Sequence, residues 1–252
     1  MQIIRFDSLE STNKYCEALD LSQVEDFTCY WALEQTAGIG QRGNHWHAEP
    51  GKSLTFSLVL HPSFLPADRQ FLLTEALSLA LVDFLLSICV PKLGDLSAKP
   101  TEECVKIKWP NDIYVGNRKI CGTLVSTRLQ GTQIASAVCG IGLNVNQVAF
   151  PDWVPNPTSL TLLTGKQYDL EELLKQLLLC IEHRYSGLRE GLDPEPEYLS
   201  HLLNLGVPAR YIYKDKEIEA TITGVDPYGH LLLSDSDGRQ LSCGMKEISF
   251  LF

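Results

Sequence analysis

The chain has 252 residues, of which 44% are hydrophobic and 21% are charged, a composition typical of a soluble globular protein. This length suffices for one large domain, or for one medium domain and one small one. The 31 acidic residues outnumber the 21 Lys and Arg residues, and the net charge of −10 argues against a protein that binds nucleic acid or an anionic membrane surface.

The first half of the chain predicts strands that alternate with helices. Residues 3–6 form a short strand, and Ser11-Thr12-Asn13 then offers cap-forming side chains before a helical pattern. Residues 27–35 alternate as a strand does, residues 53–62 are a β-rich run that ends at a proline, and a helix follows from about Ala67 to Cys89.

The second half predicts a β-rich block, a helix and a separate β-rich end. Four short strands lie between residues 105 and 145, separated by turn residues, and a strongly periodic helix spans residues 169–190. From Pro208 onward the chain consists of short strands and turns, a pattern that suits a small β-barrel appended to a main α+β domain.

The most apolar segment, residues 71–90, predicts a buried amphipathic helix. A membrane span is the alternative, but Glu75 and Asp83 argue against it. Eight cysteines are scattered without a C-x-x-C pair, and the N-terminus has no apolar leader, so we expect reduced thiols in the cytoplasm. A zinc site or a catalytic cysteine is the alternative that the spacing disfavours.

The loop GIGQRGNHW, residues 38–46, matches the G-x-G-x-x-G pattern of dinucleotide sites. That pattern requires a helix after the glycines, whereas a Pro-Gly turn and another strand follow here. A P-loop ending at Gly51-Lys52-Ser53 would need Gly at position 46, where Trp46 stands. The loop is therefore either a long hairpin turn or a glycine loop whose backbone approaches a ligand.

Two further segments combine turns with polar side chains. In KWPNDIYVGNRKICG, residues 108–122, Pro110 ends a strand, so Asn111 and Asp112 lie in a turn where their side chains can face a ligand, and Lys119 begins the next strand. GIGLNVN, residues 140–146, adds glycines and two amides after an apolar strand. Each segment alone is compatible with an ordinary β-turn, but together they form a specific set.

This set resembles the catalytic domain of biotin protein ligases, the biotin–[acetyl-CoA-carboxylase] ligases. KWPND matches the family pattern at every position, and its order relative to STN, Q-x-A-G, RKICG and GIGLNVN is preserved. The resemblance covers nearly the whole chain. It implies an α+β fold with a mixed β-sheet of the class II synthetase-like type over residues 1–190, followed by an SH3-like β-barrel over residues 204–252.

The resemblance also implies an activity. The family forms biotinyl-AMP from biotin and ATP with Mg²⁺, and then transfers biotin to one lysine of the biotin carrier domain of a carboxylase. We expect a cytoplasmic, ligase-only protein without a DNA-binding domain. Because many such ligases dimerise by extending a sheet edge, a homodimer remains open.

Roles for individual residues follow from the same resemblance. Lys119 is the expected active-site cation, Asp112 is expected to hold Mg²⁺ or orient the attacking lysine, and Arg42 is expected to assist. The nucleotide contacts are expected from Arg42, Trp46, Asn111 and Asn144. The biotin contacts are expected from Ser11, Thr12, Asn13, Gln35, Gly38, Gly40, Gln41, Trp46, Lys119, Gly122 and Gly142.

The glycine loop departs from the pattern of many relatives, because Ile39, Gln41 and Asn44 stand where they carry arginines. An arginine there orders the loop and binds the anionic intermediate, so the departure bears on retention of the adenylate more than on biotin. Two alternatives accompany the ligase. One is a lipoate or octanoate transferase of the same superfamily fold, and the other, motivated by the missing arginines, is a weakened paralogue that binds biotin or its adenylate without catalysis.

Overall fold

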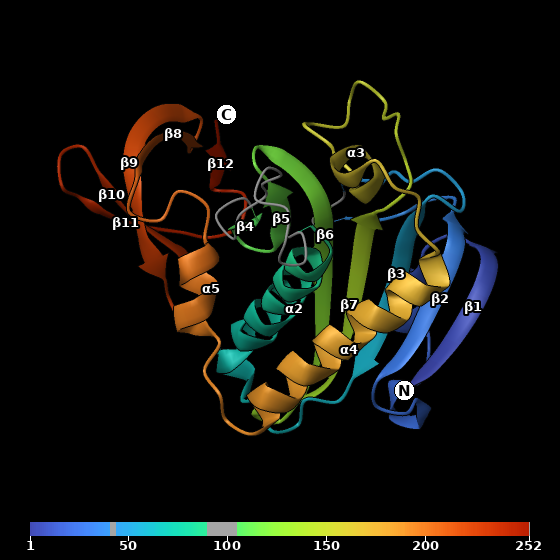
Figure 1. The fold of residues 1–252 in the computed structure, drawn as a ribbon. Helices are drawn as coiled ribbons and strands as arrows, with labels where there is room; N and C mark the ends of the chain where they lie inside the picture. The colour runs from blue at the N-terminus through green and yellow to red at the C-terminus, as the bar shows by residue number, and fades with distance from the viewer. Residues whose placement is uncertain (41–43, 90–104, 252) are drawn as a thin grey trace.

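The computed structural model describes residues 1–40, 44–89 and 105–251, and its largest element is a seven-stranded mixed sheet (Figure 1). The strand order is β1-β2-β3-β7-β6-β5-β4, with β1 parallel to β2 and all other neighbours antiparallel. The strands are β1 Gln2–Leu9, β2 Thr28–Gln35, β3 Ser53–Leu60, β4 Val105–Lys108, β5 Asp112–Val115, β6 Arg118–Gln130 and β7 Gln133–Asn144.

Helices cover the sheet unequally. The two long helices α2 and α4 pack on each other across one face, as Figure 1 shows, while α1 packs against β2, β3 and β7. The helical elements are α1 Thr12–Glu17, η1 Leu21–Gln23, η3 Ala67–Arg69, α2 Phe71–Cys89, α3 Leu160–Thr164, α4 Leu170–Arg189 and α5 Glu195–His201. A second small apolar cluster, which includes Cys16, Tyr30 and Val138, lies beneath α1, so α1 occupies the face opposite α2 and α4.

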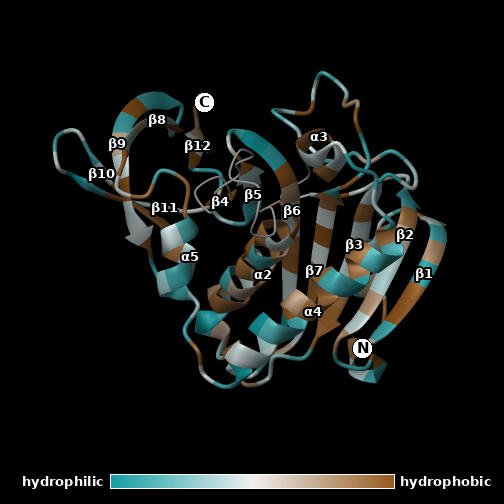
Figure 2. Cartoon of the chain, viewed as in Figure 1, coloured by the Kyte–Doolittle hydropathy of each residue, from teal (hydrophilic) through white to brown (hydrophobic). Residues whose placement is uncertain are grey.

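The two faces of the sheet centre differ because side chains alternate along a strand. On β3 and β7 the apolar residues, such as Phe56 and Ile141, join the core under the long helices. Figure 2 shows the alternation as brown and paler bands along the strands. The residues between them are small or polar and face the other side: Ser53, Thr55, Ser57, Gly140, Gly142 and Asn144. The sequence thus leaves room for a site on that face.

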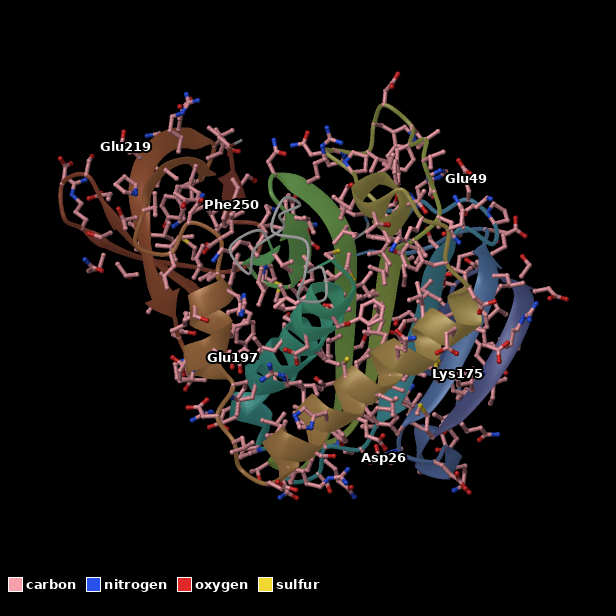
Figure 3. All side chains as sticks on the ribbon, viewed as in Figure 1. Asp26, Glu49, Lys175, Glu197, Glu219 and Phe250 are labelled. Carbon is pink, nitrogen blue, oxygen red and sulfur yellow. The ribbon has the colours of Figure 1, made fainter. Side chains whose placement is uncertain are left out.

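Helix α2 was expected to be buried and amphipathic; it is buried, but the expectation of an amphipathic pattern is wrong. Every residue from Glu75 to Val82 is buried, which covers all sides of the helix, because the sheet, α4 and α5 surround it. By length and composition α2 could cross a membrane, but 67% of its apolar window is buried inside the protein, as in a core helix. Arg184 of α4 forms paired hydrogen bonds with Asp83 of α2 and with Glu197 of α5, labelled in Figure 3, and so fastens the three helices.

Glu75 makes the stability of this core depend on pH. Burial raises the pKa of Glu75 from 4.5 to about 8, with Glu195 and Asp193 adding to the effect and Arg69 opposing it. Between these pH values the folded chain holds one proton more than the unfolded chain, so the free energy of unfolding falls as pH rises. We expect Glu75→Gln to flatten this decline by about 1 kcal/mol per pH unit. Urea unfolding of both proteins at pH 5 and pH 7 measures it, and parallel curves would contradict it.

The C-terminal residues form a second, antiparallel sheet of five strands in the order β11-β10-β9-β8-β12. These strands are β8 Pro208–Tyr213, β9 Lys216–Val225, β10 Leu231–Asp235, β11 Gln240–Cys243 and β12 Ile248–Phe250. The Trp109 indole donates to the Gly229 carbonyl at 3.0 Å, and a Cβ on Gly229 would lie 2.4 Å from the Phe71 ring. The turn before β10 is therefore in direct contact with the N-terminal part of the chain, at Trp109 and Phe71. The closure of this sheet into an SH3-like barrel and the domain boundary between residues 190 and 204 stay predictions.

The strands and long helices that the sequence predicts are present in the structure, with differences at their ends and two short helices in addition. Strand β6 extends from Arg118 to Gln130 and is longer than the short strands expected there, and the short helices α3 and α5 were not predicted. Asp112 was expected in a turn, but it is the first residue of β5, because it pairs with Lys108 across the β4–β5 hairpin. The seven described cysteines are free and mostly buried, and no cluster of His, Cys, Asp and Glu in the described ranges could hold a metal.

Candidate active site

A cavity of about 130 Å³ opens on the polar face of the main sheet. Its floor is made by the small residues of β6 and β7, and its walls come from the start of α1, the end of β2 and the glycine loop. Of the residues predicted to bind biotin or to act in catalysis, the cavity brings together Ser11, Thr12, Asn13, Gln35, Gly40, Trp46, Asp112, Lys119, Gly122 and Gly142.

One end of the cavity is a buried network of hydroxyls and amides. Gln35 Oε1 accepts from the Thr12 backbone N–H at 2.6 Å and from Thr12 Oγ1 at 3.1 Å. Ser57 Oγ lies 2.8 Å from Thr12 Oγ1 and donates to Asn13 Oδ1 at 3.1 Å. Thr12, Asn13 and Ser57 are at most 3% exposed, so these groups are fixed before any ligand binds. Sequence reasoning missed Ser57, because only the strand register brings it beneath the residues of α1.

Glycines make room for the other walls. A Cβ on Gly142 would lie 2.3 Å from the Trp46 ring, and one on Gly140 would lie 2.4 Å from Asn13 Oδ1. Gly122 is less crowded, with Asp112, Trp46 and Lys119 all 3.2–3.3 Å from such an atom. The alternation of glycine with apolar residues in β7 therefore lets the indole and the amide lie directly on the sheet.

The charged end of the cavity is an ion pair between two neighbouring strands. Lys119 Nζ lies 2.7 Å from Asp112 Oδ1, and the two side chains are 27% and 24% exposed. The Lys119 ammonium also stands over the Trp46 ring, 5.6 Å from its centroid. The Lys119 backbone is held on its free side, since its N–H donates to the Asn156 carbonyl at 2.7 Å and its carbonyl accepts from Thr158 at 2.9 Å.

Lys108 is a second cation near the Lys119–Asp112 pair, outside the lining of the cavity, and sequence reasoning did not select it. Burial lowers the pKa of Lys108, and Lys119 lowers it further, while Asp112 raises it. Its ammonium lies 5.1 Å from the ring centroid of Phe250, labelled in Figure 3, on the last strand of the second sheet. The sequence feature that could have identified Lys108 is its position as the first residue of the KWPND segment. In the structure it lies directly opposite Asp112 in the β4–β5 pair.

A second cavity of about 400 Å³ adjoins the first and shares Lys119 and Trp46 with it. Its lining includes Asn144 and the aromatic pair His47 and Trp153, whose ring centroids are 5.7 Å apart. Trp153 is 62% exposed, an unusual position for the largest apolar side chain, and a flat ring there can stack on a ligand. The two cavities meet at Lys119 and at the loop residues Asn44, His45 and Trp46, which line both of them.

Several predicted residues lie outside the first cavity. Asn111 is 3% exposed and donates its amide to the Thr123 carbonyl at 2.8 Å, so it ties the turn to β6 rather than facing a cavity. Gly38 does not line the cavity either, but its carbonyl accepts from Trp46 N–H at 2.9 Å at the base of the loop. Gln41 and Arg42 lie outside the described residues, so their predicted roles stay predictions.

Asp112 is the only carboxylate among the described residues that line the first cavity. Mg²⁺ is usually held by one or two carboxylates together with substrate phosphates and water, so the single carboxylate of Asp112 fits this ion if phosphates bind beside it. The Lys119 ammonium, which already pairs with Asp112, would share the carboxylate with the Mg²⁺ ion.

Comparison with known proteins gives a consistent picture. The profile of the biotin/lipoate A/B protein ligase family matches residues 5–144, which include both ends of the first cavity. The bifunctional ligase/repressor BirA of Bacillus subtilis is 30% identical over 94% of this chain and 70% of its own length. The biotin–[acetyl-CoA-carboxylase] ligase of Paracoccus denitrificans is 28% identical over 92% of this chain and 94% of its own length.

Solved structures agree in fold. A biotin protein ligase from Aquifex aeolicus in complex with biotin and ATP superimposes with a TM-score of 0.78 and 25% identity, over 99% of this chain and 98% of that one. The biotin acetyl coenzyme A carboxylase synthetase of Helicobacter pylori, with bound biotinylated ATP, has a TM-score of 0.55 and 26% identity over 96% of this chain and 99% of that one.

Proposed function

Because the chain belongs to the biotin/lipoate A/B protein ligase family, we propose that it is an ATP-dependent biotin protein ligase. It forms biotinyl-AMP from biotin and ATP and transfers biotin to one lysine of the carrier domain of a biotin-dependent carboxylase. The observation that carries the proposal is the pairing, in one cavity, of a fixed polar network with a lysine at the junction to a second cavity.

The polar network suits the head group of biotin. A cyclic urea offers N–H donors on two sides and a carbonyl acceptor between them. Asn13 Oδ1 supplies an acceptor, while Gln35 directs its Oε1 at Thr12 and keeps its amide N–H groups for another partner. Each such bond that a ligand fails to make costs about 1–3 kcal/mol in a buried site, which makes the head group the specificity determinant.

Lys119 suits the first chemical step, in which a carboxylate oxygen attacks the α-phosphorus of ATP. The new P–O bond forms as the bond to the bridging oxygen breaks, and pyrophosphate leaves. Two unit charges ~4 Å apart repel by about 4 kcal/mol at an effective dielectric of ~20, and a fixed cation removes this barrier. The lysine stands where both cavities meet, so we place the biotin carboxylate in the first and the nucleotide in the second.

Asp112 suits two tasks beside Lys119. Its carboxylate would hold Mg²⁺, which supplies charge neutralisation for the phosphates when bound. In the second step the carrier lysine must lose a proton before its nitrogen attacks the acyl carbonyl and AMP leaves. Asp112 can accept that proton, since it lines the cavity at 24% exposure.

The described part of the glycine loop bears on the weakened-paralogue alternative. Ile39 forms a β-bridge with His45, and both line the first cavity together with Asn44. An aliphatic side chain at position 39 cannot bind the phosphate of the intermediate, so retention of biotinyl-AMP depends on Lys119, which lines both cavities, and on Arg42, whose role stays a prediction. We therefore expect full adenylation with faster release of the intermediate than an arginine at position 39 would allow.

A transfer assay tests the proposal directly. The protein is incubated with ATP, Mg²⁺, labelled biotin and an apo carrier domain. We expect label on the carrier only when ATP is present, and no product when lipoate replaces biotin. Binding of biotin without transfer of label to the carrier would favour the non-catalytic paralogue, and lipoylated carrier would favour the transferase.

Three further expectations belong to this proposal. We propose that the second sheet closes as an SH3-like barrel over residues 204–252, supported by its five antiparallel strands. Free cysteines throughout the described chain support a reducing, cytoplasmic setting, and the net charge of −10 supports protein and small-molecule substrates over nucleic acid.

Strand β1 pairs on one side with β2, so its other edge is the candidate surface for a homodimer, which sedimentation would test.

A further inference from the structure

The side-chain amide of Asn13 lies between the first cavity and an exposed carboxylate on its own helix. Asn13 Nδ2 donates to Glu17 Oε1 at 3.4 Å, while Asn13 Oδ1 accepts from Ser57 Oγ at 3.1 Å. The absence of a side chain on Gly140 leaves the space that Oδ1 occupies on the floor. The amide oxygen therefore lies against the cavity floor at Gly140, and the amide nitrogen lies on the side of Glu17, which does not line the cavity.

Among the described neighbours of this amide, only one distinguishes its two orientations. A hydroxyl both donates and accepts, so Ser57 tolerates either end of the Asn13 amide. A carboxylate only accepts, so a rotated amide would set its oxygen against Glu17 Oε1 with no hydrogen between them. The bond at 3.4 Å is long, but the repulsion that replaces it in the rotated state adds to the preference.

Strand β6 holds this carboxylate in place. Ser126 Oγ donates to the same Glu17 Oε1 at 2.7 Å, which is the shorter of its two contacts. The Arg128 guanidinium donates to the Glu17 carbonyl and, at 3.3 Å, to the Leu19 carbonyl, so it fastens the end of α1. An exposed glutamate would otherwise sample many rotamers, and these contacts restrict it.

We propose that Glu17, held by Ser126, is a positioning residue that determines specificity by keeping the Asn13 amide oxygen turned into the cavity. The cavity then accepts a hydrogen bond from an N–H of the ligand head group, as a urea provides. This inference rests on the proposed function. Neither Glu17 nor Ser126 lines the cavity, so they act on the ligand only through Asn13.

Substitutions at position 17 test the direction of the effect. A lysine at this position donates rather than accepts, so Glu17→Lys favours the rotated Asn13 amide. The rotated amide would direct its N–H groups into the cavity, toward the N–H groups of the ligand head group. We expect Glu17→Lys to weaken biotin binding at least about tenfold, and Glu17→Gln, which can donate or accept, to weaken it about threefold. Titration calorimetry with biotin and, separately, with ATP measures this, and we expect ATP affinity within about twofold of the unmodified protein.

Glu10→Lys is the matched control. Glu10 is an exposed acid just before the same helix, its partner is Lys14, and the substitution makes the same change in net charge. We expect Glu10→Lys to leave biotin affinity within about twofold, and Ser126→Ala to weaken it by a smaller factor than Glu17→Lys. Desthiobiotin, which retains the cyclic urea, should lose affinity for the Glu17→Lys protein by the same factor as biotin.

The outcomes separate this inference from the proposed function. Biotin affinity equal in the Glu17→Lys and Glu10→Lys proteins would overturn the inference alone. A loss of ATP affinity parallel to the loss of biotin affinity would also overturn it, since that would indicate a general disturbance of α1. Thermal unfolding of each variant reports such a disturbance independently. An unmodified protein that bound no biotin would overturn both the inference and the proposed function.

Discussion

Replacing Lys119 with alanine should slow the formation of biotinyl-AMP at least about 100-fold, a loss of about 2.7 kcal/mol of transition-state stabilisation. Lys119 is the cation at the junction of the two cavities, 2.7 Å from Asp112. Without it, the attacking carboxylate meets the α-phosphate beside an unneutralised Asp112. Single-turnover formation of the adenylate measures the step, and we expect kcat to fall more than the apparent affinity for biotin.

A double-mutant cycle distinguishes two ways in which Lys119 could act. If it only neutralised Asp112, then Lys119→Ala combined with Asp112→Ala would recover most of the lost rate. If it stabilises the reacting charges, the double variant stays at least as slow as Lys119→Ala. Lys175→Ala on α4, which removes a lysine from an exposed ion pair with Glu171, is the control for loss of a positive charge. Near-normal adenylation by the Lys119→Ala protein would remove Lys119 from its role.

The parts of the site that the sequence predicts are those carried by short, local patterns. Gly140 and Gly142 alternate with apolar residues in β7, and this alternation alone places them on one face of a strand. Lys119 and Asp112 flank a hairpin of fixed length, so their meeting follows once the two strands are recognised. The polar run at residues 11–13 likewise predicts a helix start, and the structure shows Ser11 as the N-cap of α1.

The parts that the sequence does not predict depend on register between distant strands or on helix packing. Ser57 reaches Asn13 because β3 pairs with β7 in one register and α1 packs across both, and a shift by one residue would turn Ser57 into the core. Lys108 gains its aromatic neighbour from a strand more than 140 residues away. Helix α2 lacks the polar stripe expected of it because helices cover it on the side that faces away from the sheet.

For Asn111 the sequence predicts the turn correctly, but the nucleotide contact predicted for its side chain stays untested. The turn in which it lies was predicted, and a polar side chain in a turn is compatible with a ligand contact. In the structure its amide donates to the Thr123 backbone in the interior, a bond that holds the turn against β6. Nothing in the local pattern distinguishes a side chain that turns inward to the backbone from one that turns outward to a ligand.

Replacing Gly140 with alanine should weaken biotin binding by at least about 30-fold, or about 2 kcal/mol. The added Cβ would lie 2.4 Å from Asn13 Oδ1 and 3.1 Å from its Cγ, so the amide must leave its place. Asn13 is 3% exposed and its amide is held from two sides, so moving the amide breaks the contacts that fix it. The ligand then loses its acceptor, while the second cavity, which does not include this residue, keeps its affinity for ATP. Titration calorimetry with each ligand measures both effects.

Two companion variants make the cause of this loss identifiable. Gly224→Ala adds the same methyl group to strand β9, where no atom lies within 4 Å, and should change neither stability nor biotin binding measurably. Crowding a packed site costs typically 1–3 kcal/mol, so Gly140→Ala should also lower the free energy of unfolding. Adding Asn13→Ala removes the obstructing amide, so the double variant should regain that stability but not the affinity for biotin. If it regained affinity as well, the amide of Asn13 would not be the group that recognises the head of the ligand.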